Sequence, residues 1–148
     1  MRIRTATAED IPALCALLSV LFAQEEEFTP DPRAQSRGLA RIITSPELGA
    51  VLAATDGPQI VGMVVLLYTL STALGDRVAL LEDMVVSPQV RGTGIGTQLL
   101  ERAVAVARAR GCKRITLLTD RSNESAQRFY RKQGFELSPM VPLRLNLA

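Results

Sequence analysis

The stretch from Leu80 to Leu100, LLEDMVVSPQVRGTGIGTQLL, decides the fold of this chain. Its first part is an apolar run typical of a buried strand, and its last residues are good helix formers. Between these parts, Gly92, Gly94 and Gly96 stand at every second position. A strand, a glycine loop and a helix in this order predict free backbone N–H groups at a helix N-terminus, where an anion can bind.

The glycine loop fits one phosphate-binding pattern and fails two others. The Rossmann fingerprint, counted from Gly92 and Gly94, needs a third glycine where Thr97 stands. A Walker loop needs Gly-Lys-Ser/Thr, which the sequence lacks. The pattern Arg-x-x-Gly-x-Gly is fulfilled from Arg91 to Gly96. A tight turn at a glycine-rich helix start is the open alternative to phosphate binding.

The composition of the chain limits its domain number, its partners and its location. A chain of 148 residues with 47% hydrophobic content can bury one sizeable core, so we expect a single domain over 1–148. The formal charge of +2 gives no reason to expect a nucleic acid partner. The longest apolar run, IVGMVVLLYTL, is too short to span a membrane as a helix. Cys15 and Cys112 stand far apart, which favours reduced thiols and a cytoplasmic location.

The chain contains no histidine. This excludes Ser-His-Asp and Cys-His nucleophiles, histidine general bases and histidine-ligated metals. Any chemistry must use carboxylates, Tyr, Lys, Ser, Cys or the backbone, and we expect no metal.

Hydrophobic periodicity predicts a mixed α/β (α+β) fold in the order β-α-α-β-β-β-α-β-α-β, with a mostly antiparallel sheet flanked by helices. Turn residues Asp56, Gly57 and Pro58 divide a hairpin. The expected strands cover 2–6, 49–55, 59–70, 76–87, 113–120 and 141–147. The expected helices cover 8–27, 33–45, 95–110 and 124–133.

Two stretches together resemble the GNAT superfamily of N-acetyltransferases: LLEDMVVSPQVRGTGIGTQLL and TLLTDRSNESAQRFYRKQGFE. The most specific part runs from Leu80 to Glu136, and its motifs are most similar to the diamine, or spermidine/spermine, N-acetyltransferase branch. The resemblance implies that the loop amides bind the pyrophosphate of acetyl-CoA. It also implies that the preceding strand pairs with the pantetheine arm and that two strands splay apart to admit the thioester.

The resemblance also assigns roles to residues. It implies that Glu82 is the general base that deprotonates an amine and that Tyr130 is the acid that protonates the leaving CoA thiolate. Partners are then acetyl-CoA, an amine acceptor and, as an open question, a second copy of the chain in a homodimer. The positions implied for acetyl-CoA are Met84, Val85, Val86, Arg91, Gly92, Thr93, Gly94, Ile95, Gly96, Thr97, Asn123, Ala126 and Phe129.

Several alternatives stay open at this point. Strand alternation sends Glu82 and Asp83 to opposite faces, so at most one of them can face the cleft, and we favour Glu82. Asn123 is also a suitable helix cap. The run 25–27 is either a solvated helix end or an attraction for a cationic amine. A noncatalytic acyl-CoA-binding or sensing domain is the alternative function, and the sequence does not specify the acceptor.

Overall fold

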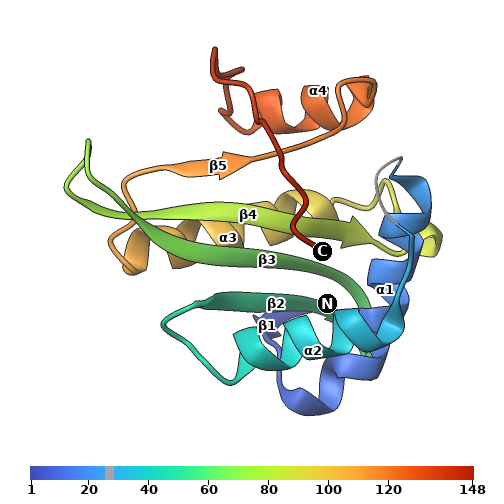
Figure 1. Cartoon of the computed structure of the whole chain (residues 1–148). Helices are drawn as coiled ribbons and strands as arrows, with labels where there is room; N and C mark the ends of the chain where they lie inside the picture. The colour runs from blue at the N-terminus through green and yellow to red at the C-terminus, as the bar shows by residue number, and fades with distance from the viewer. Residues whose placement is uncertain (26–28) are drawn as a thin grey trace. The chain divides into compact units, whose positions relative to one another are not determined.

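A computed structural model describes residues 1–25 and 29–148 and divides the chain into two compact units, 1–118 and 119–148. The first unit holds every strand and the second holds the last helix (Figure 1). The strands are β1 (Arg2–Thr5), β2 (Gly49–Asp56), β3 (Gln59–Ser71), β4 (Asp76–Val86) and β5 (Ile115–Leu117). The helices are α1 (Ile11–Gln24), α2 (Pro32–Ile43), α3 (Ile95–Ala109) and α4 (Glu124–Lys132), with short 3-10 turns η1 (Ala8–Asp10) and η2 (Pro88–Val90).

The sheet confirms the predicted class. Its spatial order is β1-β2-β3-β4-β5, and neighbouring strands are antiparallel except β4 and β5, which are parallel. Consecutive antiparallel strands need only short connections, whereas the parallel step from β4 to β5 requires a crossover, which α3 supplies. The expected β-α-α-β-β-β-α-β order of the first unit is therefore confirmed.

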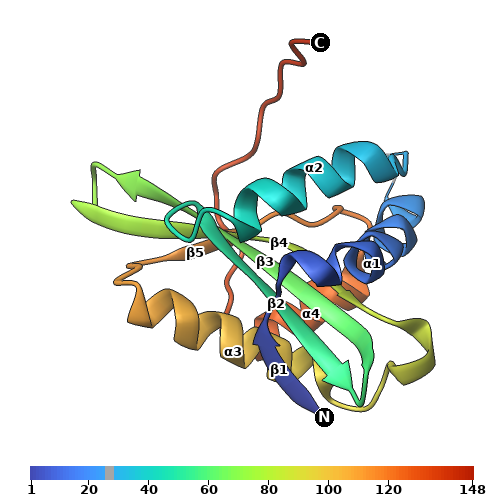
Figure 2. The same cartoon turned by 90° about the horizontal axis from the view of Figure 1, so that it is seen from below.

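Helices cover both faces of the sheet (Figure 2). On one face α1 and α2 bury Leu14, Leu18 and Leu39 against the sheet residues Met63 and Val65. On the opposite face α3 buries Leu99, Leu100 and Ala103. Each fully buried leucine contributes about 1.5–3 kcal/mol relative to an exposed one. These two apolar layers hold β4 from both sides and so fix the strand that carries the predicted site.

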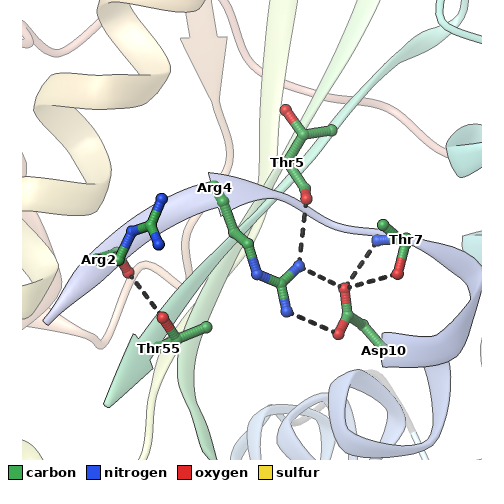
Figure 3. Close-up of polar contacts among 6 residues, drawn as sticks. All are labelled: Arg2, Arg4, Thr5, Thr7, Asp10 and Thr55. Carbon is green, nitrogen blue, oxygen red and sulfur yellow. Dashed lines mark hydrogen bonds and ion pairs between the residues drawn. The ribbon is translucent and has the colours of Figure 1, made fainter. Parts of the chain in front are cut away.

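A paired carboxylate anchors the junction between β1 and η1 (Figure 3). Asp10 accepts hydrogen bonds from both terminal nitrogens of Arg4, at 2.7 and 2.9 Å, and from the backbone N–H of Thr7 at 2.7 Å. These bonds, the Arg4 bond first, lower the pKa of Asp10 to about 2. Beside them, the Thr55 hydroxyl donates to the Arg2 carbonyl at 3.4 Å, which ties β2 to β1 (Figure 3).

The second unit differs from expectation at its end. The strand expected over 141–147 is not formed; the structure has no regular element after α4 in the described chain. Its alternating apolar side chains find no packing partner, since Leu143 is 95% exposed and Leu145 is 83% exposed. Alternation predicts a strand only where a sheet edge and a core receive it.

Some expected boundaries also shift. The strand expected over 113–120 shortens to β5, Ile115–Leu117. The first helix begins as η1 and continues as α1 to Gln24, and Glu26 and Glu27 lie outside the described residues. No helix in the described part of the chain is both long and apolar enough to cross a bilayer.

Candidate active site

The pairing between strands β4 and β5 ends near the predicted site. Their parallel pairing runs through Ala79, Leu80 and Leu81 of β4 and ends at the pair Leu81–Leu117. β4 continues to Val86, paired with β3 on its other side. From Glu82 onward, therefore, the β5-facing edge of β4 makes no strand pairing within the described residues. This edge includes Met84, Val85 and Val86. The Val86 carbonyl accepts from Arg91 Nε, and the other main-chain groups that face away from β3 are available to an extended ligand.

The glycine loop has the geometry of an anion site. Gly92 has φ +81° and Gly94 has φ +88°, a left-handed conformation that side chains other than glycine rarely adopt. An added Cβ at either position would meet no atom within 4 Å, so backbone conformation, and not crowding within the chain, requires glycine here. Gly94 is the N-cap of α3, and Ile95, Gly96 and Thr97 form its first turn.

The backbone amides of this loop are unused. None of the N–H groups from Gly92 to Thr97 donates a hydrogen bond to a group in the described residues; the next amide, of Gln98, donates to the Gly94 carbonyl at 3.1 Å. Two side chains stabilise the loop itself: Arg91 Nε donates to the Val86 carbonyl at 3.2 Å, and Thr93 Oγ1 to the Val90 carbonyl at 2.5 Å. Free amides at the positive end of a helix form a site for a phosphate group.

A β-bulge changes the expectation for Glu82 and Asp83. Val65 pairs with Glu82 and Met63 pairs with Val85, so one residue of β3 stands opposite both Asp83 and Met84. Asp83 is the bulged residue with φ +53°, the one non-glycine residue with a positive φ in the described chain. The bulge breaks the alternation on which the opposite-face argument rests.

Both carboxylates consequently belong to the face covered by α1 and α2. Residues directly opposite in an antiparallel pair share a face, and Val65, the partner of Glu82, packs in the core beneath α1. Asp83 lines a cavity on that same face. The argument from strict alternation therefore does not hold at this pair, because it assumed an unbroken strand. Asp83 lines the cavity, whereas Glu82 is exposed and is not among the lining residues, so its place in the cleft stays a prediction.

The cavity lies between α1, α2 and β4 and has a volume of about 330 Å³. Its walls are mainly apolar, and its polar members are Thr29, Asp31, Gln35 and Asp83. Burial, and after it the nearby negative charges of Glu82 and Glu25, raise the pKa of Asp83 to about 7. A carboxyl group with this pKa can be ionised or protonated near neutral pH.

The remaining predicted residues lie on the second unit. Asn123 caps α4, because its side chain accepts a hydrogen bond from the Ala126 N–H at 3.0 Å, so the capping interpretation is confirmed. Tyr130 packs edge-on against Phe129 and Phe135, with ring centroids 5.2 and 5.7 Å away. Burial raises the pKa of Tyr130 to about 12, so its phenol keeps its proton at neutral pH and can act as a donor.

The structure thus groups the predicted residues into two sets. Glu82, the β4 edge 84–86 and the loop 91–97 are continuous on the first unit, while Asn123, Ala126, Phe129 and Tyr130 share α4 on the second. No three His, Cys, Asp or Glu side chains among the described residues are arranged to hold a metal ion. The sequence did not predict the residues of α1 and α2 that line the cavity, because their spacing is that of any helix packed on a core.

Known proteins resemble this chain over most of its length. The family model described as Acetyltransferase (GNAT) family matches residues 16–135. The aminoalkylphosphonate N-acetyltransferase of Salmonella typhimurium is 31% identical over 136 residues, covering 92% of this chain and 85% of the relative. The thialysine N-epsilon-acetyltransferase of Bos taurus is 33% identical over 79 residues, 53% of this chain and 46% of the relative.

A solved structure shares the fold. A predicted acetyltransferase from Clostridium acetobutylicum, solved with acetyl-CoA, superposes with a TM-score of 0.78 at 22% identity and covers 98% of this chain and 95% of its own. The family match spans the unpaired β4 edge, the glycine loop and α4. The chain is a member of the GNAT family of acetyltransferases, an N-acetyltransferase enzyme of the family that uses acetyl-CoA.

Proposed function

We propose that this protein moves an acetyl group from acetyl-CoA to a primary amine of a small molecule or peptide, by direct attack and without a covalent enzyme intermediate. One observation carries the proposal: the unused amides of Gly92–Thr97 directly follow the open edge of β4, which begins at Glu82. An anion site, a free strand edge and a carboxylate therefore follow one another along a single segment.

This segment supplies the binding part of the reaction. The amides of the loop 92–97, with Arg91 beside them, hold the diphosphate of acetyl-CoA. The main chain of Met84, Val85 and Val86 pairs with the pantetheine arm, and Asn123, Ala126 and Phe129 contact the cofactor from α4. No metal enters the reaction, and the residues 1–148 act as one N-acetyltransferase domain.

Proton transfers complete the reaction. An alkylamine has a pKa of about 10 and is protonated at neutral pH, so it must lose a proton before its nitrogen can attack. Glu82 accepts that proton, directly or through water. The nitrogen then forms a bond to the thioester carbon, the C–S bond breaks, and Tyr130 gives a proton to the departing sulfur. The nitrogen loses its second proton to water, and a proton taken up from water restores the Tyr130 phenol. The raised pKa of Tyr130 keeps this proton available.

The charges at the cavity indicate which acceptor the enzyme favours. The Salmonella relative is an aminoalkylphosphonate N-acetyltransferase. In this chain an acceptor with a phosphonate group would meet the carboxylates of Asp31 and Asp83 at the cavity, and like charges there disfavour it. We therefore place the acceptor of this enzyme among amines without an anionic group.

Location and assembly follow as further parts of the proposal. Cys15 and Cys112 are both free thiols, which is consistent with the reducing cytoplasm. A homodimer stays a prediction, which sedimentation can test.

Steady-state assays of CoA-thiol release, with acetyl-CoA and a panel of amines, peptides and aminoglycosides, test the function. We expect turnover with at least one primary amine and mass spectrometry to show the acetyl group on nitrogen. Tight binding of acetyl-CoA without thiol release above the acceptor-free blank for any acceptor would indicate a binding domain instead.

A further inference from the structure

We infer that the cavity between α1, α2 and β4 selects a monoamine with a compact apolar body, whose single ammonium group lies at Asp83. The inference rests on the proposed function and names the acceptor class of the same site. The observations that support it all belong to the first unit: the cavity, the Asp83 carboxylate, which has no partner among the described residues, and the internal hydrogen bonds of Gln35 and Asp31.

Asp83 has no counter-charge among the residues that the structure describes. No hydrogen bond or ion pair reaches its side chain from any residue in 1–25 or 29–148, and the charges that act on it most, Glu82 and Glu25, are also negative. The described cavity lining contains no Lys or Arg side chain. A carboxylate in a mainly apolar cavity is costly unless it is paired. An ammonium group brought by a ligand supplies the missing charge.

Of the other polar residues that line the cavity, Gln35 and Asp31 are engaged in hydrogen bonds within the chain, and Thr29 is exposed. Gln35 is buried; its Oε1 accepts from the Asp31 N–H at 2.8 Å, and its Nε2 donates to the Cys15 carbonyl at 3.2 Å and to Ser19 Oγ at 3.3 Å. The carboxylate of Asp31 is exposed and caps α2 through the Ala34 N–H at 3.2 Å. These bonds fix the start of α2. Asp83 is the carboxylate of the lining that has no hydrogen bond or ion pair within the described residues and can receive a cationic ligand.

The walls determine what accompanies the ammonium. Leu18 and Phe22 of α1 and Leu39 and Ile42 of α2 line the cavity, and its volume of about 330 Å³ lies at the small end of ligand pockets. A methylene chain or a ring gains by leaving water against these side chains. A carboxylate would lose its hydration there without a cationic partner. A second ammonium would have only Asp31 to pair with, whose carboxylate is exposed and already caps α2.

Three amines of equal chain length test the selection: pentylamine, cadaverine and aminovalerate. They share the reacting amine and differ at the far end, which is apolar, cationic or anionic. We expect kcat/KM to be highest for pentylamine and lower by about tenfold or more for the other two. Equal or higher kcat/KM for cadaverine or aminovalerate would overturn the inference.

A substitution of Asp83 tests whether this residue causes the selection among amines. Asn tolerates a left-handed φ, so Asp83→Asn removes the charge without forcing the bulge to change. We expect KM for pentylamine to rise about tenfold or more, while acetyl-CoA affinity stays unchanged. Asp56→Asn, at the exposed end of β2 next to the hairpin turn, is the matched control and should leave both values unchanged. An unchanged KM in Asp83→Asn would overturn the inference.

The two proposals fail separately. If none of the amines is acetylated although acetyl-CoA binds, the proposed function fails. If amines are acetylated but cadaverine is preferred, and Asp31→Asn abolishes that preference, the site takes a diamine between two carboxylates. That outcome leaves the acetyltransferase function intact and contradicts the monoamine inference.

Discussion

Two aspartates in the first unit have opposite surroundings. Asp10 is held by Arg4 and Thr7, its side chain is 11% exposed, and its pKa is lowered to about 2. Asp83 has no partner in the described residues, adopts φ +53°, and has a pKa raised to about 7. A paired carboxylate stabilises the fold, whereas an unpaired one in a cavity costs stability and is available to a ligand. The difference separates a structural junction from a candidate site.

The largest effect on activity should come from a change at Glu82, which is next to Asp83 in the candidate site. Glu82→Gln should lower kcat by about a hundredfold or more at neutral pH. Activity should recover partly at high pH, where the amine deprotonates itself. The pH profile of kcat for the variant and the unmodified enzyme measures this. A full rate across the range would pass the base role to Asp83 or to a water chain.

A second test extends the comparison to α4. Tyr130→Phe keeps the ring that packs on Phe129 and Phe135 but removes the phenolic proton. We expect kcat and kcat/KM to fall together by roughly a hundredfold, with little change in acetyl-CoA affinity. Steady-state kinetics and calorimetry provide the two readouts. A variant as fast as the unmodified enzyme would make Tyr130 a packing residue and solvent the proton source.

On the structural side, Asp10→Asn should reduce stability and leave turnover unchanged. Because Arg4 is 40% exposed, solvent screens the pair, and we expect a loss of about 1 kcal/mol in the free energy of unfolding at neutral pH. The pKa of Asp10 is lowered on folding, so this stabilisation is complete above the unfolded value of 3.8 and is lost as pH falls through about 2.

Denaturant unfolding at several pH values measures this loss. The difference between Asp10→Asn and the unmodified protein should narrow in acid. A double-mutant cycle with Arg4→Gln isolates the ion pair. A coupling energy of zero, or a change in kcat, would contradict the structural role.

The smallest effect is the change in stability with pH that Asp83 contributes, and its sign is opposite to that of Asp10. Its pKa is raised on folding, so the native state retains a proton that the unfolded state has lost between 3.8 and about 7. Stability should therefore fall as pH rises through this window, and Asp83→Asn should not show that fall. We expect the variant to gain stability relative to the unmodified protein as pH rises from 3.8 to neutral. If the free energy of unfolding of Asp83→Asn and of the unmodified protein changed with pH in the same way, the pKa of Asp83 would not be raised on folding.

Local patterns predicted the framework well. The glycine spacing, the apolar strand before it and the helix after it indicated the β4, loop and α3 segment, because each part has its own sequence signature. The helix cap at Asn123 was visible for the same reason. The alternating tail 141–147 misled, since alternation does not show whether a sheet edge is available.

The bulge and the cavity could not be predicted. Nothing in LLEDMVV marks Asp83 as a left-handed residue, because the bulge depends on the register with β3. The cavity depends on how α1 and α2 pack over β4, and the side chains that line it also fit a plain core. Both features arise from tertiary pairing and not from local pattern.

Binding of acetyl-CoA by the glycine loop is the central claim, and calorimetric titration of acetyl-CoA into the unmodified protein and Gly94→Val tests it most directly. Valine cannot adopt φ +88° without strain, and a shift of this residue disrupts the amides that receive the diphosphate. We expect clear binding by the unmodified protein and none by the variant, with unchanged circular dichroism. Equal affinity in a folded variant would contradict the assignment of the loop.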